Sequence, residues 1–216
     1  PGYMIRDIPF AVYDEEEVVY IDHPDPPEER PENLMAATNT TINGVETATL
    51  PTAVCVDEMA TVPLAYHEGF HVYQHHHFAQ PPLDMFTAMA FYPELDAAYR
   101  TLCRLEARIL RRDDWSTTRK AATLGHLIAL RRSRLGVHQS LLDYERFLER
   151  SEGTASYVEQ KARKALYYIA PEIEEAGHGW RRFYIVGAAL CWLLDATVPG
   201  WTAQVERGES PGDLLI

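Results

Sequence analysis

The sequence is short of cysteine and of long apolar runs, and each shortage excludes a class of protein. The three cysteines lie far apart in apolar-patterned segments, which argues against a disulfide framework and favours buried free thiols. They are Cys55, Cys103 and Cys191. The best candidate for a membrane span, residues 184–194, is shorter than the roughly 20 residues that a spanning helix needs. We therefore expect no membrane span.

Basic residues are also in short supply. The chain has 20 Lys and Arg against 32 Asp and Glu, which gives a formal net charge of −12 at pH 7. Phosphate binding needs a basic surface, so nucleic acid is excluded as a general partner and a cationic or neutral substrate is easier to admit. No signal peptide is visible, and we expect a cytoplasmic protein. Secretion stays open, because a leader before Pro1 would have been trimmed.

The first quarter of the chain has the pattern of β-strands. Residues 8–22 (IPFAVYDEEEVVYID) contain two β-rich runs around an acidic turn, and residues 38–50 (TNTTINGVETATL) contain two more around Asn43-Gly44. Asn-Gly is a strong hairpin signal, because both residues tolerate positive φ. Residues 52–56 (TAVCV) are predicted to form a buried strand that leads into the first helix.

From about residue 60 the apolar spacing is helical. It predicts helices at about 59–79, 94–113, 117–148, 151–169, 179–197 and 201–207. At 216 residues, with ample apolar content, the chain is expected to form a single domain over 1–216, mainly β in 1–57 and helical in 58–216. The predicted fold class is α+β, with a small N-terminal β-sheet packed on a predominantly helical body.

The sharpest chemical signal is His67-Glu68-x-x-His71, in the segment AYHEGFHVYQHHHFAQ. Residues four apart share one face of a helix, so both imidazoles can reach a single ion. Glu68 lies beside that face, where its carboxylate can accept a proton from a water activated by zinc. The pattern therefore predicts a Zn²⁺ site with Glu68 as general base.

A hydrolytic zinc site needs a third protein ligand, and the segment ERSEGTASYVEQ offers Glu152. The small residues that follow it would let this helix approach another closely. The segment EGTASYVE resembles the third-ligand segment of the gluzincin metallopeptidases, particularly the zinc aminopeptidases. The resemblance implies that Glu152 is the third zinc ligand and that the fold is zincin-like. It is confined to local motifs, since two long predicted helices separate His71 from Glu152.

Two further segments resemble the same family. Tyr184, with Gly187 three residues later, is similar to the tyrosine that hydrogen-bonds the oxyanion of the tetrahedral intermediate. A core aromatic residue is the alternative for Tyr184. The segment NGVET is similar to the strand whose glutamate binds a substrate's amino terminus, which implies substrate binding by Glu46, although Val45 and Thr47 depart from the family pattern. An exposed carboxylate on a hairpin is the alternative for Glu46.

Other polar residues near these motifs have more local interpretations. Glu159 lies seven residues after Glu152 on the same predicted helical face and could orient a ligand histidine through its second ring nitrogen; a surface carboxylate is the alternative. His75, His76 and His77 are expected to form a solvated helix end or one wall of a cleft, because two helical turns separate His75 from His67.

The sequence therefore predicts a zinc-dependent hydrolase, most specifically a metallopeptidase that acts on a peptide or protein substrate. Two rivals remain open. One is a catalytically inactive zincin-like module with a binding or regulatory role, and the other is a helical interaction protein in which the HExxH pattern is accidental. The substrate, the choice between endo- and exopeptidase action and the oligomeric state are not determined by the sequence.

Overall fold

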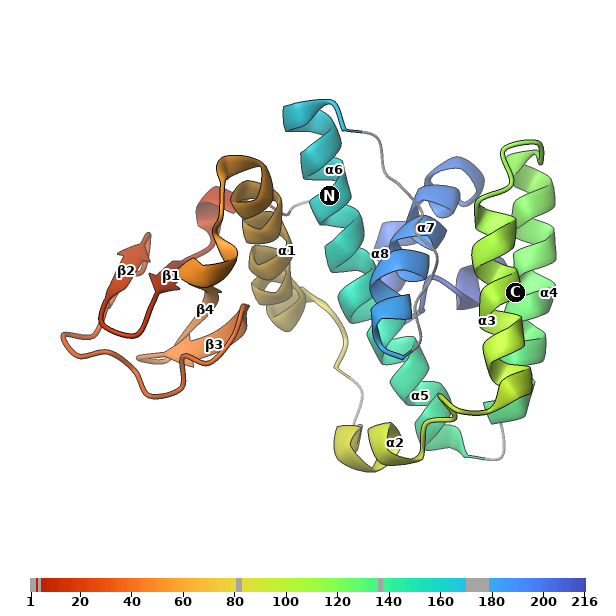
Figure 1. The fold of residues 1–216 in the computed structure, drawn as a ribbon, viewed down its shortest axis with the longest axis horizontal. Coiled ribbons are helices and arrows are strands. Elements are labelled where there is room, and N and C mark those ends of the chain that lie inside the picture. The colour runs from red at the N-terminus through yellow and green to blue at the C-terminus, as the bar shows by residue number, and fades with distance from the viewer. Residues whose placement is uncertain (1–2, 4, 81–82, 136–137, 170–178) are drawn as a thin grey trace. The chain divides into compact units, whose positions relative to one another are not determined.

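The computed structural model describes residues 3, 5–80, 83–135, 138–169 and 179–216 (Figure 1). The chain groups into two compact units. The first contains Pro1–Phe78 and Val158–Pro171, and the second contains Ala79–Tyr157 and Glu172–Ile216. The first holds the sheet and the second is helical, so the α+β class is confirmed.

The sheet has four strands in the order β2-β1-β4-β3. Their bounds are β1 Phe10–Tyr13, β2 Val18–Ile21, β3 Thr38–Ile42 and β4 Val45–Pro51. Each predicted hairpin is an antiparallel pair, and the central strands β1 and β4 run parallel. Asn43 and Gly44 have φ values of 46° and 77°, as a tight two-residue hairpin turn requires. Both hairpin predictions are confirmed.

The predicted strand over residues 52–56 is wrong. Strand β4 ends at Pro51, and Thr52–Val54 forms a 3-10 turn. The side chains of Val54 and Val56 are exposed, so this apolar run lies on the surface where the chain turns from the sheet into the first helix. Proline at the end of β4 removes a backbone donor, which is compatible with the end of strand pairing there.

Helix α1, Glu58–His77, follows this turn directly. The side chain of Asp57 accepts a hydrogen bond from the backbone nitrogen of Ala60 at 2.8 Å, which satisfies one of the amide groups at the helix start. One buried core cluster of the first unit joins the sheet to this helix; it consists of Ile8, Phe10, Ala48, Leu50 and Val72. This packing fixes which side of α1 is turned away from the sheet.

The second unit is built mainly from helices. They are α2 Met85–Phe91, α3 Ala97–Leu110, α4 Thr117–Leu135, α5 Gln139–Leu148, α7 Arg181–Thr197 and α8 Trp201–Glu206. A π-helical turn, η3 (Glu149–Gly153), follows α5 and leads into α6, Thr154–Tyr167, which ends in the first unit. Helix α2 was not predicted, and the single helix expected over 117–148 is two helices.

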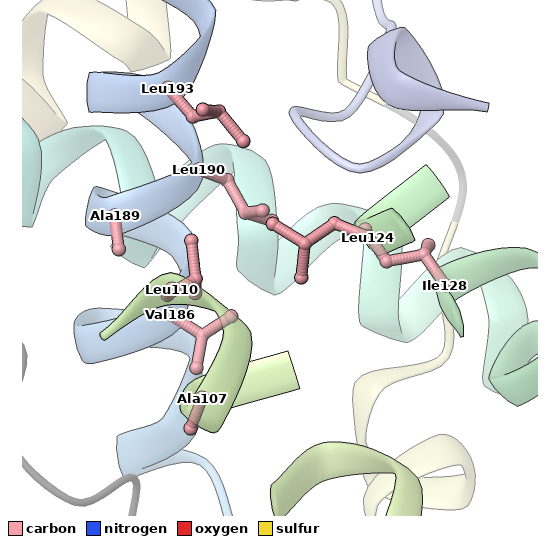
Figure 2. Close-up of a cluster of buried hydrophobic side chains, with 8 residues drawn as sticks. All are labelled: Ala107, Leu110, Leu124, Ile128, Val186, Ala189, Leu190 and Leu193. Atoms are coloured by element: carbon pink, nitrogen blue, oxygen red, sulfur yellow. The ribbon is translucent and has the colours of Figure 1, made fainter. Parts of the chain in front are cut away.

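Side chains from α3, α4 and α7 form one apolar core of the second unit (Figure 2). Leu124 and Ile128 come from α4, Leu110 comes from α3, and Leu190 comes from α7; each is at most 4 % exposed. A second cluster around Tyr99, Leu148 and Phe183 lies in the same unit. Together these cores hold α5 and α7 firmly, and η3 is continuous with α5.

The second unit also buries a network of charged side chains. Arg131 is fully buried and contacts Glu106, Glu145 and Glu149. Arg132 contacts Glu145, Glu149 and Asp213. Burial of so many charges is costly unless each is paired, and in this network arginines and carboxylates alternate. The helices of the second unit are therefore tied together by ion pairs as well as by apolar packing.

Two expectations from composition can be compared with the structure. All three cysteines are free thiols, as predicted, but only Cys191 is fully buried, whereas Cys55 and Cys103 are half-buried. Among the helices of the described residues, none combines the length and apolar content that crossing a membrane requires.

Candidate metal centre

Helix α1 carries the three residues of the HExxH pattern side by side. His67 and Glu68 are 3 % and 6 % exposed, and His71 is half-buried. The two imidazole rings have centroids 4.9 Å apart, which is the arrangement expected of residues one helical turn apart. The helix therefore presents both rings from one side.

The hydrogen bond of His71 determines which ring nitrogen carries its proton. His71 Nδ1 lies 2.7 Å from the amide oxygen Oε1 of Gln74, which is buried on the same helix. An amide oxygen only accepts hydrogen bonds, so Nδ1 of His71 donates. In the neutral ring Nε2 then keeps its lone pair, which is the form that binds a metal ion.

His67 has a comparable neighbour on a different helix. Its Nδ1 lies 3.3 Å from Oε2 of Glu159 in α6, and the other carboxylate oxygen of Glu159 lies 3.0 Å from Nη2 of Arg163. A carboxylate facing Nδ1 is the kind of neighbour that orients a ligand histidine with Nε2 towards a metal. Glu159 therefore lies next to His67, and its role in orienting a ligand histidine stays a prediction.

Glu152 completes the candidate centre. Within the described ranges of the chain, one group of three side chains could hold a metal ion: His67, His71 and Glu152. Each offers one ligand atom, and the three atoms lie within 4.8 Å of one another. Glu152 belongs to η3, and Glu159 follows two turns later in the continuous helix α6. The two histidines belong to the first compact unit and Glu152 to the second.

The donor set fits zinc chemically. In zinc sites, histidine nitrogens and carboxylate oxygens bond the ion at about 2.0–2.2 Å. Two imidazoles with one carboxylate leave a fourth position open, as catalytic zinc sites do. The Nδ1 contacts of both histidines leave Nε2 as the nitrogen suited to the metal.

A contact between two glycines places Tyr184 near the π-helical turn. A Cβ atom added to Gly187 would lie 2.6 Å from Cα of Gly153, and one added to Gly153 would lie 2.9 Å from Cα of Gly187. Only glycine permits such an approach of two helix backbones. Because Tyr184 precedes Gly187 by about one turn and Glu152 precedes Gly153 directly, the start of α7 lies alongside η3. The predicted close helix approach at Gly153 is confirmed.

Glu46 is held by neighbouring side chains. In β4 it lies opposite Thr41 of β3, whose hydroxyl donates to its carboxylate, and Asn39 Nδ2 donates to Oε2 at 3.2 Å. Nε2 of His75 lies 4.0 Å from Oε1 of Glu46. Since His75 follows His71 by four residues, Glu46 lies about one helical turn, roughly 6 Å along the axis, beyond the HExxH segment.

A cavity of about 420 Å³ lies at the other side of α1. Its lining includes Glu46, Tyr73, His76 and His77 but not His67 or His71. His75, His76 and His77 are exposed, and α1 ends at His77. The expectation of a solvated helix end is confirmed, and the cavity is not lined by the histidines of the candidate metal centre.

Two features of the centre were missed in the sequence. Gln74 could have been recognised, because a residue three positions after His71 lies on the same helical side and an amide can accept from a ring nitrogen. The π-helical turn around Glu152 had no such signal, because a π turn depends on the tertiary surroundings of the helix. Comparison with protein-family models, curated proteins and solved structures finds no match to this chain.

Proposed function

We propose that the protein is a zinc-dependent hydrolase, most specifically a metallopeptidase, with His67, His71 and Glu152 as the zinc ligands. The observation that carries the proposal is the convergence of these three ligand atoms within 4.8 Å. The contacts of Gln74 and Glu159 with the two histidines support it, because they favour the tautomer that binds zinc.

Glu68 is the general base in this proposal. When bound, zinc lowers the pKa of a coordinated water towards about 7 and polarises the scissile carbonyl. Glu68 is buried beside His67, where its carboxylate can take the proton that the attacking water loses and pass it to the leaving amine. A purely structural metal site has no use for a carboxylate in this position.

Tyr184 and Glu46 have supporting roles in the proposal. A phenol hydroxyl aimed at the developing oxyanion lowers the barrier, and the contact between Gly153 and Gly187 brings the start of α7 alongside the turn that carries Glu152. Glu46, which lines the cavity on the other side of α1, would bind the amine of a peptide that extends beyond the HExxH segment to that cavity. The net charge of −12 is compatible with a cationic or neutral peptide.

The test combines metal analysis with a single substitution. We expect the purified protein to bind one zinc ion per chain and to cleave members of a peptide library. Glu68→Gln should keep the metal and lose about 10²–10⁴-fold in kcat/KM, because only proton transfer is removed. Glu58→Gln, an exposed carboxylate in the first turn of the same helix, is the matched control and should cleave normally. A native protein with no affinity for zinc would falsify the proposal.

One observation favours a second candidate, a catalytically inactive zincin-like module. The carboxylate of Glu46 is already engaged by Asn39, Thr41 and His75, so a substrate amine would have to displace existing contacts. The module binds zinc but turns over no peptide even when saturated with metal. The peptide library therefore separates the two candidates.

A further inference from the structure

The π-helical turn η3 is an irregularity that contains one of the proposed zinc ligands. It inserts Glu149–Gly153 between the regular helices α5 and α6. A π turn has poorer backbone geometry than an α-helix and persists only where its surroundings hold it in place, frequently at functional sites. The side chains that hold this turn therefore bear on the position of Glu152.

Glu149, the first residue of the turn, points into the second unit. It is 1 % exposed. Its Oε2 accepts from Arg132 Nη2 at 2.8 Å and from the backbone nitrogen of Gly212 at 3.1 Å, and its Oε1 lies 3.5 Å from Nη2 of Arg131. Three donors from two distant segments thus fix this carboxylate.

Arg132 is in turn fixed by the C-terminal segment and by α5. Its guanidinium donates to Oδ1 of Asp213 at 2.5 Å, to the Ser210 hydroxyl at 2.8 Å and to Oε1 of Glu145 at 3.1 Å. A Cβ atom added to Gly212 would lie 2.6 Å from Oε2 of Glu149 and 2.7 Å from Nη2 of Arg132. The segment is therefore fitted closely against this ion pair.

Stability alone is a poor explanation for such a cluster, because well-packed apolar side chains of similar volume often stabilise a core as well as a buried ion pair does. We propose that Arg132 and Glu149 are positioning residues, which hold the π-helical turn and thereby direct Glu152 towards the metal. The inference rests on the proposed function, since it takes Glu152 as a ligand. If the turn relaxed to an α-helix, Glu152 would rotate by about 100° relative to α5.

The test replaces both partners together, so that no buried charge is left unpaired. We expect the double variant Arg132→Met with Glu149→Leu to fold with a melting temperature close to that of the parent in the absence of metal. Its zinc affinity, measured by competition with a chromophoric chelator, should fall about 10–100-fold. A crystal structure of the metal-free variant should show an α-helix through residues 148–154. Arg112→Met with Asp114→Asn, which removes an exposed ion pair, is the matched control and should keep the parental affinity.

A folded double variant with parental zinc affinity and an intact π turn would overturn the inference. If the double variant does not fold, Glu149→Gln preserves the shape of the side chain and tests the same idea: a drop in zinc affinity supports it, and parental affinity contradicts it. Glu152→Gln separates this inference from the proposed function. If that substitution leaves zinc binding unchanged, the ligand assignment is wrong; if it abolishes binding and the double variant does not weaken it, only the positioning role is wrong.

Discussion

The two polar clusters of this protein are built from the same kinds of titratable side chain, but in opposite combinations. In the second unit each buried carboxylate meets an arginine: Arg131 lies between Glu106 and Glu145, and neither carboxylate has any exposed side-chain surface. On α1 and η3, by contrast, His67, His71 and Glu152 bring three electron-pair donors together. In the first cluster, arginine side chains balance the charge of the carboxylates. None of the three residues of the second cluster is an arginine or a lysine, and this cluster has the composition of a metal-ion site.

The difference shows how a residue type can mislead when it is considered alone. A buried glutamate such as Glu145 looks like a candidate for acid–base chemistry, yet Arg131, Arg182 and Arg132 outweigh its burial and hold its pKa well below the usual range. A carboxylate held in this way stays charged and is a structural element. What distinguishes the candidate metal centre is the geometry of its neighbours and not the number of its titratable groups.

The largest expected effect comes from removing one member of the buried network. Arg131→Met leaves Glu106 and Glu145 buried with one partner fewer, and we expect the free energy of unfolding to fall by about 3–5 kcal/mol. Urea denaturation monitored by circular dichroism measures it. Arg112→Met, in an exposed ion pair with Asp114, should change little, because exposed pairs contribute little. If both variants lost the same free energy of unfolding, the buried network would contribute no more to stability than an exposed ion pair.

Zinc should stabilise the folded protein through the other cluster. At a free concentration about a hundredfold above Kd, ligand binding adds about 2.7 kcal/mol to the free energy of unfolding. Thermal melting with zinc and with a chelator measures the shift. His71→Ala should show no such shift, and a shift of the same size in that variant would place the zinc elsewhere on the chain.

A smaller effect is expected from the acceptor that orients His71. Gln74→Leu removes the oxygen that accepts from Nδ1 of His71, so the zinc affinity should fall about 10–100-fold, or about 1.4–2.7 kcal/mol, while the melting temperature without metal changes little. Gln139→Leu, an exposed glutamine bonded to Asp143, is the matched control. Unchanged zinc affinity in Gln74→Leu would contradict the tautomer argument.

The smallest effect on the free energy of unfolding is expected at low pH, when Asp213 at the edge of the buried network becomes protonated. Burial alone would raise the pKa of Asp213, but the charge of Arg132 and the hydrogen bonds from Arg146 and Ser210 hold that pKa below its usual value. Because the folded-state pKa is lowered, this carboxyl stabilises the fold above the unfolded pKa of about 3.9, and the contribution is lost as pH falls through the folded pKa. Asp213→Asn should therefore lose less stability than the parent between about pH 6 and about pH 3. Identical urea-denaturation profiles against pH would show that Asp213 contributes nothing.

Local patterns predicted the parts of the fold that local forces determine. The turn at Asn43 and Gly44 follows from their tolerance of positive φ, and the helix expected at about 59–79 from apolar spacing is α1, Glu58–His77. The segment 52–56 was misassigned because apolar content is ambiguous where a chain runs over the surface. The predicted helix 117–148 was too long because helical spacing continues on both sides of residues 136–138, although α4 and α5 are separate helices.

Parts of the candidate centre that lie at a fixed spacing on one helix could be predicted from the sequence. Parts that are brought together only by tertiary packing could not. The interval between His67 and His71 reflects the helix itself, and Glu152 was found through a short segment that resembles a known one. The network was invisible because its members, such as Glu106, Arg131 and Glu145, are brought together only by helix packing. The π turn at Glu149 was missed for the same reason, since its partners Arg132 and Gly212 are distant in sequence.

The first compact unit is discontinuous along the chain, and this has a consequence for how the protein is made. Residues 158–171 belong with the sheet and α1, yet they are synthesised only after α3, α4 and α5. Glu159 therefore reaches His67, and Tyr167 reaches the backbone of Glu58, late in translation. Contacts between such distant segments slow folding. The first unit therefore cannot be completed until residues 158–171 have been synthesised, after most of the second unit.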